Sequence, residues 1–387
     1  MIRTEMLFLL GACSLLACGC GSDSGQSALR QGMAAFKDKN YPEAITCLNR
    51  ATQRITDSAD LYYHLGCAYL EKGELEPATA AFNAALDLQP QHGETLAGLG
   101  QIAYYKKDLP KAQAFFERAL AASVSSDDAK ASILNGLALA LAGQQRNDLA
   151  RLHLLRAQQV SRMYAPSLYN LASLYRDVYN LREEALDQFE LYLRVADKQD
   201  RYFEKGENNV NRLRLNVERT QAEELDALRR DPAAAARLLH EGISAQSTKQ
   251  YPKAIKCYRD ALAADPLTFN AALGLAVIYK RQGQRAEALE AFKRAAAINP
   301  GHQDSYLQAA ELAVQLKRFD EAEKILDRAI ARSPYNPASA ELMARIRYAE
   351  ARLPEARVYG EFYLSLLRGD NKNRAAYEKW VKSLPAK

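Results

Sequence analysis

Residues 59–92, ADLYYHLGCAYLEKGELEPATAAFNAALDLQPQH, decide the fold, because the chain repeats this pattern at intervals of about 34 residues. Small residues show the interval most clearly. One column consists of Gly32, Gly66, Gly100, Gly136, Gly242, Ala276, Ala310 and Ala344. A second column in the same phase consists of Ala44, Ala78, Ala112, Ala150, Ala185, Ala254, Ala288, Ala322 and Ala356. Such self-similarity indicates stacked supersecondary units, none of which can bury its apolar face alone.

Within the unit, two apolar runs have helical spacing. The first contains Leu61, Leu65 and Tyr69, and the second contains Ala78 and Phe82. Gly73 lies between the runs, and Pro90 closes the second because proline cannot continue the helical hydrogen-bond ladder. Each unit therefore predicts two helices joined by a tight turn. Nine such units predict an all-α chain.

Several columns of the unit resemble the tetratricopeptide repeat family. The matching positions are Tyr62, Leu65, Gly66, Tyr69, Ala78, Phe82, Ala85 and Pro90. The resemblance recurs over most of the chain and implies a right-handed superhelical solenoid of about nine repeats. It also implies that the first helix of each repeat lines a concave groove.

The first residues have the features of a secretory signal peptide over residues 1–17. Arg3 precedes an apolar run from Met6 to Ala17, which is shorter than the ~20 residues that a membrane-spanning helix needs. The sequence LLAC at 15–18 resembles the lipobox of bacterial lipoproteins, in which the enzyme cuts before a cysteine that carries lipid. We therefore expect Cys18 to be lipidated, with Cys20 and Cys13 as weaker alternatives. The other interpretation is an ordinary cleaved signal peptide.

The repeat phase divides the remaining chain. Residues 18–26 are rich in Gly and Ser and predict a flexible tether, and residues 27–199 form a first array of about five repeats. We expect a two-residue insertion in the loop of the fourth repeat, between Gly143 and Ala150.

The period fails over residues 200–234. A break at GENN, residues 206–209, precedes an amphipathic helix, which is either a hinge or partner-binding helix, or a degenerate repeat. Residues 235–370 form a second array of four repeats. Residues 371–387 predict a capping helix in which Trp380 is buried.

Composition argues against several function classes. The net charge is +5 over 387 residues, with both signs interspersed, whereas a nucleic-acid partner favours a clustered basic face. No catalytic motif and no His/Cys cluster with metal-ligand spacing occurs, and the repeats explain Cys47, Cys67 and Cys257 as core residues. We expect no enzyme activity, cofactor, metal or small-molecule substrate.

Candidate binding residues lie on the first helices, off the packing columns. In the first array they are Tyr63, Tyr104, Tyr105 and Tyr169, with Leu70, Ile133 and Leu137 making the groove apolar. Tyrosine combines a large contact area with a polar tip, so these side chains could anchor a peptide; alternatively, they pack against neighbouring repeats. In the second array Lys280, Arg281 and Arg345, together with Glu311, predict a groove that is polar and mixed in charge. Lys280 and Arg281 could bind an acidic peptide there, or are solvated charges.

These observations favour a lipid-anchored scaffold of the bacterial cell envelope that binds peptide segments of other proteins. The resemblance to tetratricopeptide lipoproteins implies assembly of a secretion, pilus, polysaccharide-export or outer-membrane complex. Gly19 after Cys18 resembles the sorting pattern for the outer membrane, so we expect the protein to face the periplasm. The alternatives are a soluble periplasmic or secreted adaptor and a non-catalytic subunit of an enzyme complex.

Overall fold

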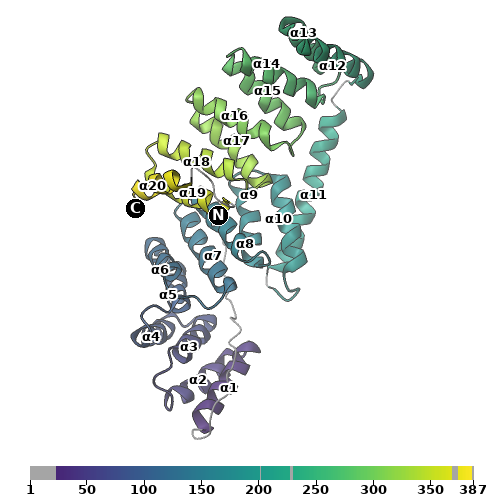
Figure 1. The fold of residues 1–387 in the computed structure, drawn as a ribbon. Helices are drawn as coiled ribbons and strands as arrows, with labels where there is room; N and C mark the ends of the chain where they lie inside the picture. The colour runs from purple at the N-terminus through teal and green to yellow at the C-terminus, as the bar shows by residue number, and fades with distance from the viewer. Residues whose placement is uncertain (1–22, 201, 227–229, 368–373, 386–387) are drawn as a thin grey trace. The chain divides into compact units, whose positions relative to one another are not determined.

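Twenty helices and no strand make up the part of the chain that the computed structural model describes, residues 23–200, 202–226, 230–367 and 374–385 (Figure 1). Eighteen of the helices form nine consecutive helix–turn–helix pairs. The first five pairs are α1 (Asp23–Lys37) with α2 (Tyr41–Thr52), α3 (Ala59–Lys72) with α4 (Leu75–Leu88), α5 (Gly93–Tyr105) with α6 (Leu109–Ala121), α7 (Asp127–Gly143) with α8 (Asn147–Val160), and α9 (Ala165–Asp177) with α10 (Arg182–Val195).

A single long helix, α11 (Phe203–Asp226), follows the fifth pair. The last four pairs are α12 (Pro232–Ser247) with α13 (Tyr251–Ala264), α14 (Phe269–Arg281) with α15 (Arg285–Ile298), α16 (Gln303–Gln315) with α17 (Phe319–Arg332), and α18 (Pro337–Ala349) with α19 (Leu353–Leu366). Helix α20 (Arg374–Ser383) comes last. The all-α repeat fold and the number of repeats predicted from the sequence are therefore confirmed.

In each pair, the turn that joins the two helices contains one residue in the left-handed backbone conformation. The second pair shows the local cause, since the Ser58 side chain accepts a hydrogen bond from the Leu61 amide at the start of α3, and Gly73 ends that helix with φ 87°. Only Gly73 and Gly283 are glycines at this turn. The same position in the other pairs has a positive φ at Lys39, Lys107, Gln145, Asn180, Lys249, Lys317 and Ala351. The turn conformation thus recurs nine times even where the residue is not glycine.

The core of each array has the same central arrangement. Phe82 of α4 is 0% exposed, and a Cβ atom added at Gly66 or Gly98 would lie 2.5 Å from its ring. Tyr258 of α13 is 1% exposed, and a Cβ atom at Gly242 or Gly274 would lie 2.6 Å from its ring. The glycines let two first helices approach an aromatic residue of the second helix between them.

Three local expectations are wrong. Residues 23–26 are not part of a tether but begin α1, where Gly25 is buried against Arg54 and Ile55. The two-residue insertion of the fourth repeat lies in the last part of α7 and not in the loop, which has the same length as the loop after α5; α7 also begins two residues earlier relative to Gly136, so it has 17 residues compared with 13 in α5. Residues 206–209 lie inside α11, where Gly206 allows the helix to pack closely against Tyr192.

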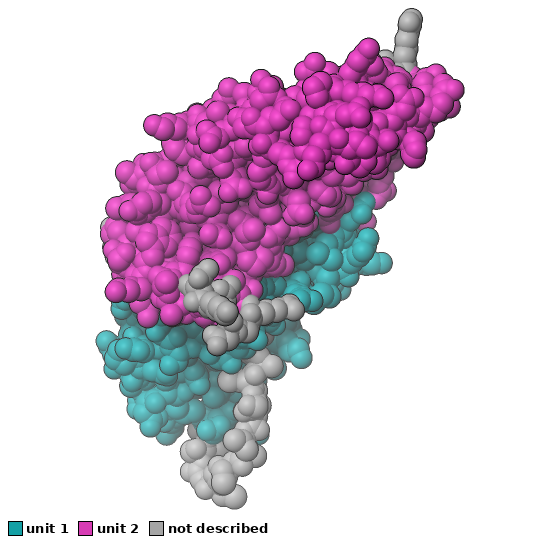
Figure 2. Space-filling view, turned by 45° about the horizontal axis from the view of Figure 1, so that its top comes forward, with its two compact units in different colours: residues 1–178, 188–206 teal, residues 179–187, 207–387 magenta. Residues whose placement is uncertain are grey.

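Two compact units make up the chain (Figure 2). The first comprises residues 1–178 and 188–206, and the second comprises residues 179–187 and 207–387. The second unit thus takes in a segment from the end of the predicted first array. There Arg332 of α17 forms an ion pair with Glu184 at 2.8 Å and another with Glu183.

Helix α20 covers α19 at the end of the second unit. Val381 is 2% exposed, and a Cβ atom added at Gly360 would lie 2.6 Å from its side chain. Trp380 is partly buried beside Tyr348 and Tyr377, with ring centroids 5.7 and 4.9 Å away. Among the described helices, none combines the length and the apolar character needed to cross a membrane.

Candidate peptide-binding groove

A hollow of about 420 Å³ lies in the second unit, where the first helices α12 and α14 flank the ring of Tyr258. Its lining residues are Ile243, Gln246, Ser247, Tyr258, Asn270, Leu273, Gly274 and Val277. The residues of each flanking helix are three or four positions apart, and this spacing puts them on one helix face. We call this hollow, between the two first helices, the groove site.

Tyr258 forms a fixed floor for the groove site. Gly242 and Gly274 leave room for its ring, and its hydroxyl donates a hydrogen bond to Gln246 Oε1 at 2.6 Å. Burial raises the pKa of Tyr258, so the hydroxyl stays protonated and keeps donating. A buried hydroxyl with a partner costs little free energy, and the floor therefore needs no rearrangement before a ligand binds.

The rim of the groove site is apolar and exposed. Ile243 is 51% exposed and Val277 is 44% exposed, and Leu273 also lines the hollow. Fully burying one such side chain stabilises a complex by about 2 kcal/mol. The prediction of a polar second groove overlooked these aliphatic residues among the charged ones.

The predicted basic residues of the second unit lie apart. Lys280 donates a hydrogen bond to Gln308 of α16, whereas Arg281 donates from Nη1 to the Tyr251 hydroxyl at 2.9 Å. Arg345 is exposed on α18. The three side chains therefore do not form one cluster, although Lys280 follows Val277 by a single turn of α14.

Tyr63 packs inside its own array. Its ring centroid lies 6.1 Å from that of Phe82 and 5.3 Å from that of His92. Burial raises the pKa of Tyr63 well above its usual value, and its hydroxyl hydrogen-bonds to Cys67, whose pKa burial raises to about 12. Tyr63 was expected either to anchor a peptide or to pack against a neighbouring repeat. Its contacts agree with packing.

The other tyrosines of the first unit differ in exposure. Tyr169 is partly buried against Phe189, Tyr192 and Tyr202, with ring centroids 5.1 to 5.4 Å apart. Tyr104 and Tyr105 contact each other at 6.3 Å, and Tyr105 is 37% exposed. Tyr104 and Tyr105 are adjacent in the sequence, so their contact does not depend on the fold.

The aliphatic residues expected beside these tyrosines are not at the surface. Leu70 is 4% exposed, and Ile133 and Leu137 are each 2% exposed. The prediction that they form an apolar groove surface is wrong, because helix packing takes up their side chains. Leu70 belongs to the same buried cluster as Phe82.

No group of three or more His, Cys, Asp or Glu side chains is placed to hold a metal ion within the described residues. Cys47, Cys67 and Cys257 are buried free thiols. The predicted lipidation site, Cys18, lies outside the described residues.

Three family profiles, each described as tetratricopeptide repeat, match residues 59–92, 239–303 and 280–346. The chain is a tetratricopeptide repeat protein. The matches include α3 and α4, and they include the helices that form the groove site.

Known proteins with this repeat differ widely from the chain. Superkiller complex protein 3 of Mus musculus is 26% identical over 288 residues, which cover 72% of this chain and 18% of that protein. The chain therefore spans less than a fifth of the length of this relative. In solved structures, Pseudomonas aeruginosa PilF is 14% identical with a TM-score of 0.40, covering 64% of this chain and 95% of its own. The Thermus thermophilus protein TTC0263 is 20% identical with a TM-score of 0.42, covering 48% and 98%.

Proposed function

We propose that this tetratricopeptide repeat protein is a non-enzymatic scaffold that binds partner peptides at the groove site and is held at a membrane by a lipid on Cys18. That the protein acts as a protein–protein interaction scaffold follows from its repeat family. The location of the binding site, its ligand and the membrane anchor are the proposal.

The observation that carries the proposal is the exposed aliphatic rim over a preformed aromatic floor. Ile243 and Val277 are about half exposed, whereas Tyr258 beneath them is buried and donates a hydrogen bond to Gln246. An occupant that places one large apolar side chain against Tyr258 removes both aliphatic side chains from water. We expect this anchor to be Leu, Ile, Met or Phe on a helical or extended partner segment.

Charged groups next to the groove site extend this recognition. Lys280, one turn beyond Val277, can exchange its hydrogen bond to Gln308 for a carboxylate of the bound peptide. Arg281 and Arg345 offer further charges along the same array, and Tyr104 and Tyr105 offer a separate contact in the first unit. These contacts add specificity to the apolar anchor.

A photo-crosslinking amino acid at Val277 tests the groove site directly. Crosslinking in the native host should yield discrete protein adducts from this position. The matched control position is Ala297, which is exposed on α15 outside the groove lining. Equal adducts from both positions, or none from Val277, would contradict the proposal.

Membrane anchoring rests on the sequence of residues 15–18. A lipid on Cys18 would hold the repeats at the cell envelope, in our proposal at the outer membrane facing the periplasm. The assemblies that such a scaffold would serve are secretion, pilus, polysaccharide-export or outer-membrane complexes. Metabolic labelling with palmitate should label the wild type but not Cys18→Ala. If the wild type stays unlabelled and soluble, the protein is a free adaptor.

A further inference from the structure

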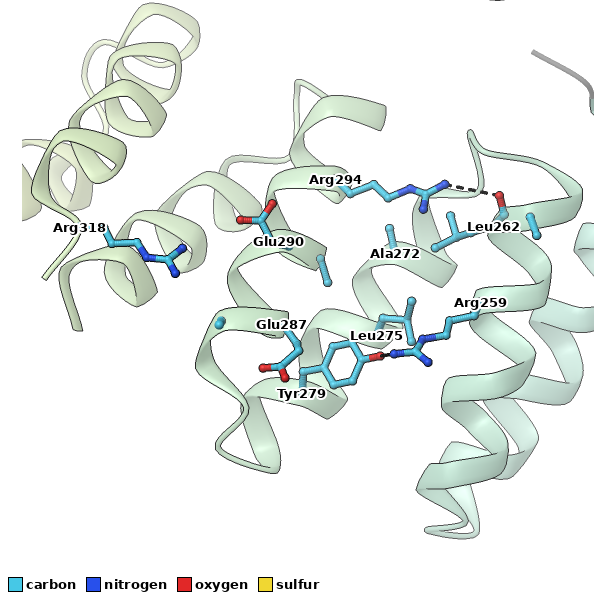
Figure 3. A pocket seen from close by; sticks show the side chains of 12 residues that line it. Arg259, Leu262, Ala272, Leu275, Tyr279, Glu287, Glu290, Arg294 and Arg318 are labelled. Carbon is cyan, nitrogen blue, oxygen red and sulfur yellow. Dashed lines mark hydrogen bonds between the residues drawn. The ribbon is translucent and has the colours of Figure 1, made fainter. Parts of the chain in front are cut away.

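A second and larger pocket, of about 870 Å³, opens between the second helices α13 and α15, with α14 as its floor (Figure 3). We call it the outer pocket. Its lining residues are Arg259, Leu262, Ala263, Ala272, Leu275, Tyr279, Ala286, Glu287, Glu290, Ala291, Arg294 and Arg318. Like the groove site, it lies wholly within the second unit.

The outer pocket and the groove site occupy opposite faces of α14. The groove site uses Asn270, Leu273, Gly274 and Val277, whereas the outer pocket uses Ala272, Leu275 and Tyr279. At about 100° per residue, the centres of these two sets lie about 180° apart around the helix. A ligand in one site therefore leaves the other accessible.

Two arginines reach across the outer pocket to neutral partners. Arg259 donates from Nη2 to the Tyr279 hydroxyl at 2.7 Å, and Arg294 donates from Nη2 to the Leu262 carbonyl oxygen at 3.4 Å (Figure 3). Neither guanidinium forms an ion pair with a carboxylate of the described chain. Each guanidinium is held in place by a hydrogen bond to a neutral group, and neither of the two carboxylates that line the pocket, Glu287 and Glu290, forms an ion pair with it.

The acidic side chains of the pocket are placed differently. Glu290 forms an ion pair with Lys293 at 3.1 Å, and Lys293 also pairs with Glu321 at 2.6 Å. Glu287 lies near the start of α15, whereas Arg294 lies two turns later on the same helix. Arg259 and Arg294 therefore mark a basic end of the pocket beside the aliphatic floor of Leu262 and Leu275, whereas the third lining arginine, Arg318, pairs with Glu321 at 3.5 Å.

We propose that the outer pocket is a second protein-docking site and that its occupant is an acidic segment of a partner protein. The segment places an aliphatic side chain on Leu262 and Leu275 and a carboxylate between Arg259 and Arg294. Carboxylates form strong, directional hydrogen bonds with guanidinium groups, and the positive charge at this end favours an anion. With both sites filled, one array bridges two partner segments.

Fluorescence anisotropy with the purified full chain tests this proposal. The probe is a short labelled peptide that alternates Leu with Asp and Glu, and the control peptide has Asn and Gln in place of the acids. We expect the acidic peptide to bind more tightly. We expect Arg259→Gln with Arg294→Gln to weaken its binding by about tenfold or more. Arg237→Gln, at an exposed arginine of α12 outside both pockets, should leave the affinity within about twofold.

A gain of affinity separates docking from loss of folding. Glu287→Gln removes a repelling carboxylate from the pocket and should tighten binding of the acidic peptide, which a merely destabilising change cannot do. Ile243→Glu should abolish the adducts from the photo-crosslinker at Val277 yet leave acidic-peptide binding intact, so that each site can be disrupted without the other. The proposal is overturned if the acidic and amide peptides bind equally, or if the Arg259/Arg294 variant and Arg237→Gln lose the same affinity.

Discussion

The aromatic centres of the two units are built alike but differ in what covers them. Phe82 and Tyr258 each lie between two glycines at the same phase of the repeat. Tyr63 covers Phe82, whereas Leu239 stands at the corresponding position of the second unit and a hollow of about 420 Å³ remains over Tyr258. The repeat thus specifies the floor, whereas residues outside the packing columns differ between the two units and leave the second floor open.

The residues around the two aromatic centres also differ in exposure, with the second unit again the more open. At the positions of Ile243 and Val277, the first unit has Cys67 and Gln101, which are 5% and 3% exposed. The half-exposed aliphatic pair in the second unit has no packing role of this kind. We conclude that the first centre is a closed core and the second is a core with one open side.

The largest expected effect is a loss of stability when the aromatic residue that both units share at their centre is removed. Phe82→Ala and Tyr258→Ala each remove a side chain that is at most 1% exposed and leave a cavity between two helices. Each variant should lower the free energy of unfolding by about 3–5 kcal/mol, measured by urea denaturation followed by circular dichroism. A loss below about 1 kcal/mol in either variant would show that its aromatic residue is not central to that unit.

Exchanging the two aromatic residues sharpens the comparison. Tyr258→Phe loses the hydrogen bond to Gln246 and should cost about 1 kcal/mol. Phe82→Tyr should cost about 1–3 kcal/mol, because buried Leu70 stands where the second unit has Gln246 and offers the new hydroxyl no acceptor. Equal effects of the two exchanges would mean that the hydroxyl partner is unimportant.

The glycines beside each ring give the smallest expected change in stability. Gly98→Ala and Gly274→Ala gain helix propensity of about 1 kcal/mol but place a methyl group against the ring, which typically costs about 1–3 kcal/mol. We expect a net loss of about 1 kcal/mol in each. Gly301→Ala is the control, since an added Cβ there meets only Asn299 Oδ1, at 3.4 Å. Net stabilisation at Gly98 or Gly274 would show that the rings can move aside.

Much of the fold could be predicted from the sequence because packing columns repeat. The spacing of Gly66, Ala78 and Phe82 specifies two helices and their contact, and the third repeat and the four repeats of the second array keep the same spacing between the two small-residue columns. The turn is harder to recognise from the sequence. Glycine, the residue typical of the left-handed conformation, occurs at this turn only at Gly73 and Gly283, whereas Lys39 and Gln145 adopt the same conformation without being glycine. Tertiary packing of the two helices imposes this conformation at the other turns.

The candidate site was less predictable for a physical reason. Tyr63 and Ile243 both lie off the packing columns on first helices, yet Tyr63 fills a space beside Phe82 and Ile243 remains at the surface. Which outcome occurs depends on the volumes of neighbouring side chains rather than on periodicity. A column-by-column comparison of the two arrays would have singled out Ile243 and Val277 as aliphatic residues at positions that hold Cys67 and Gln101 elsewhere.

The most direct test of the open second centre is to close it with the residue that closes the first. Leu239→Tyr places a tyrosine at the position of Tyr63, and adduct formation from the photo-crosslinker at Val277 is measured in this variant and in the parent. We predict that adducts fall by about tenfold, equivalent to about 1.4 kcal/mol, while the helix content and the unfolding midpoint stay unchanged. Undiminished adducts in a folded Leu239→Tyr protein would contradict the account.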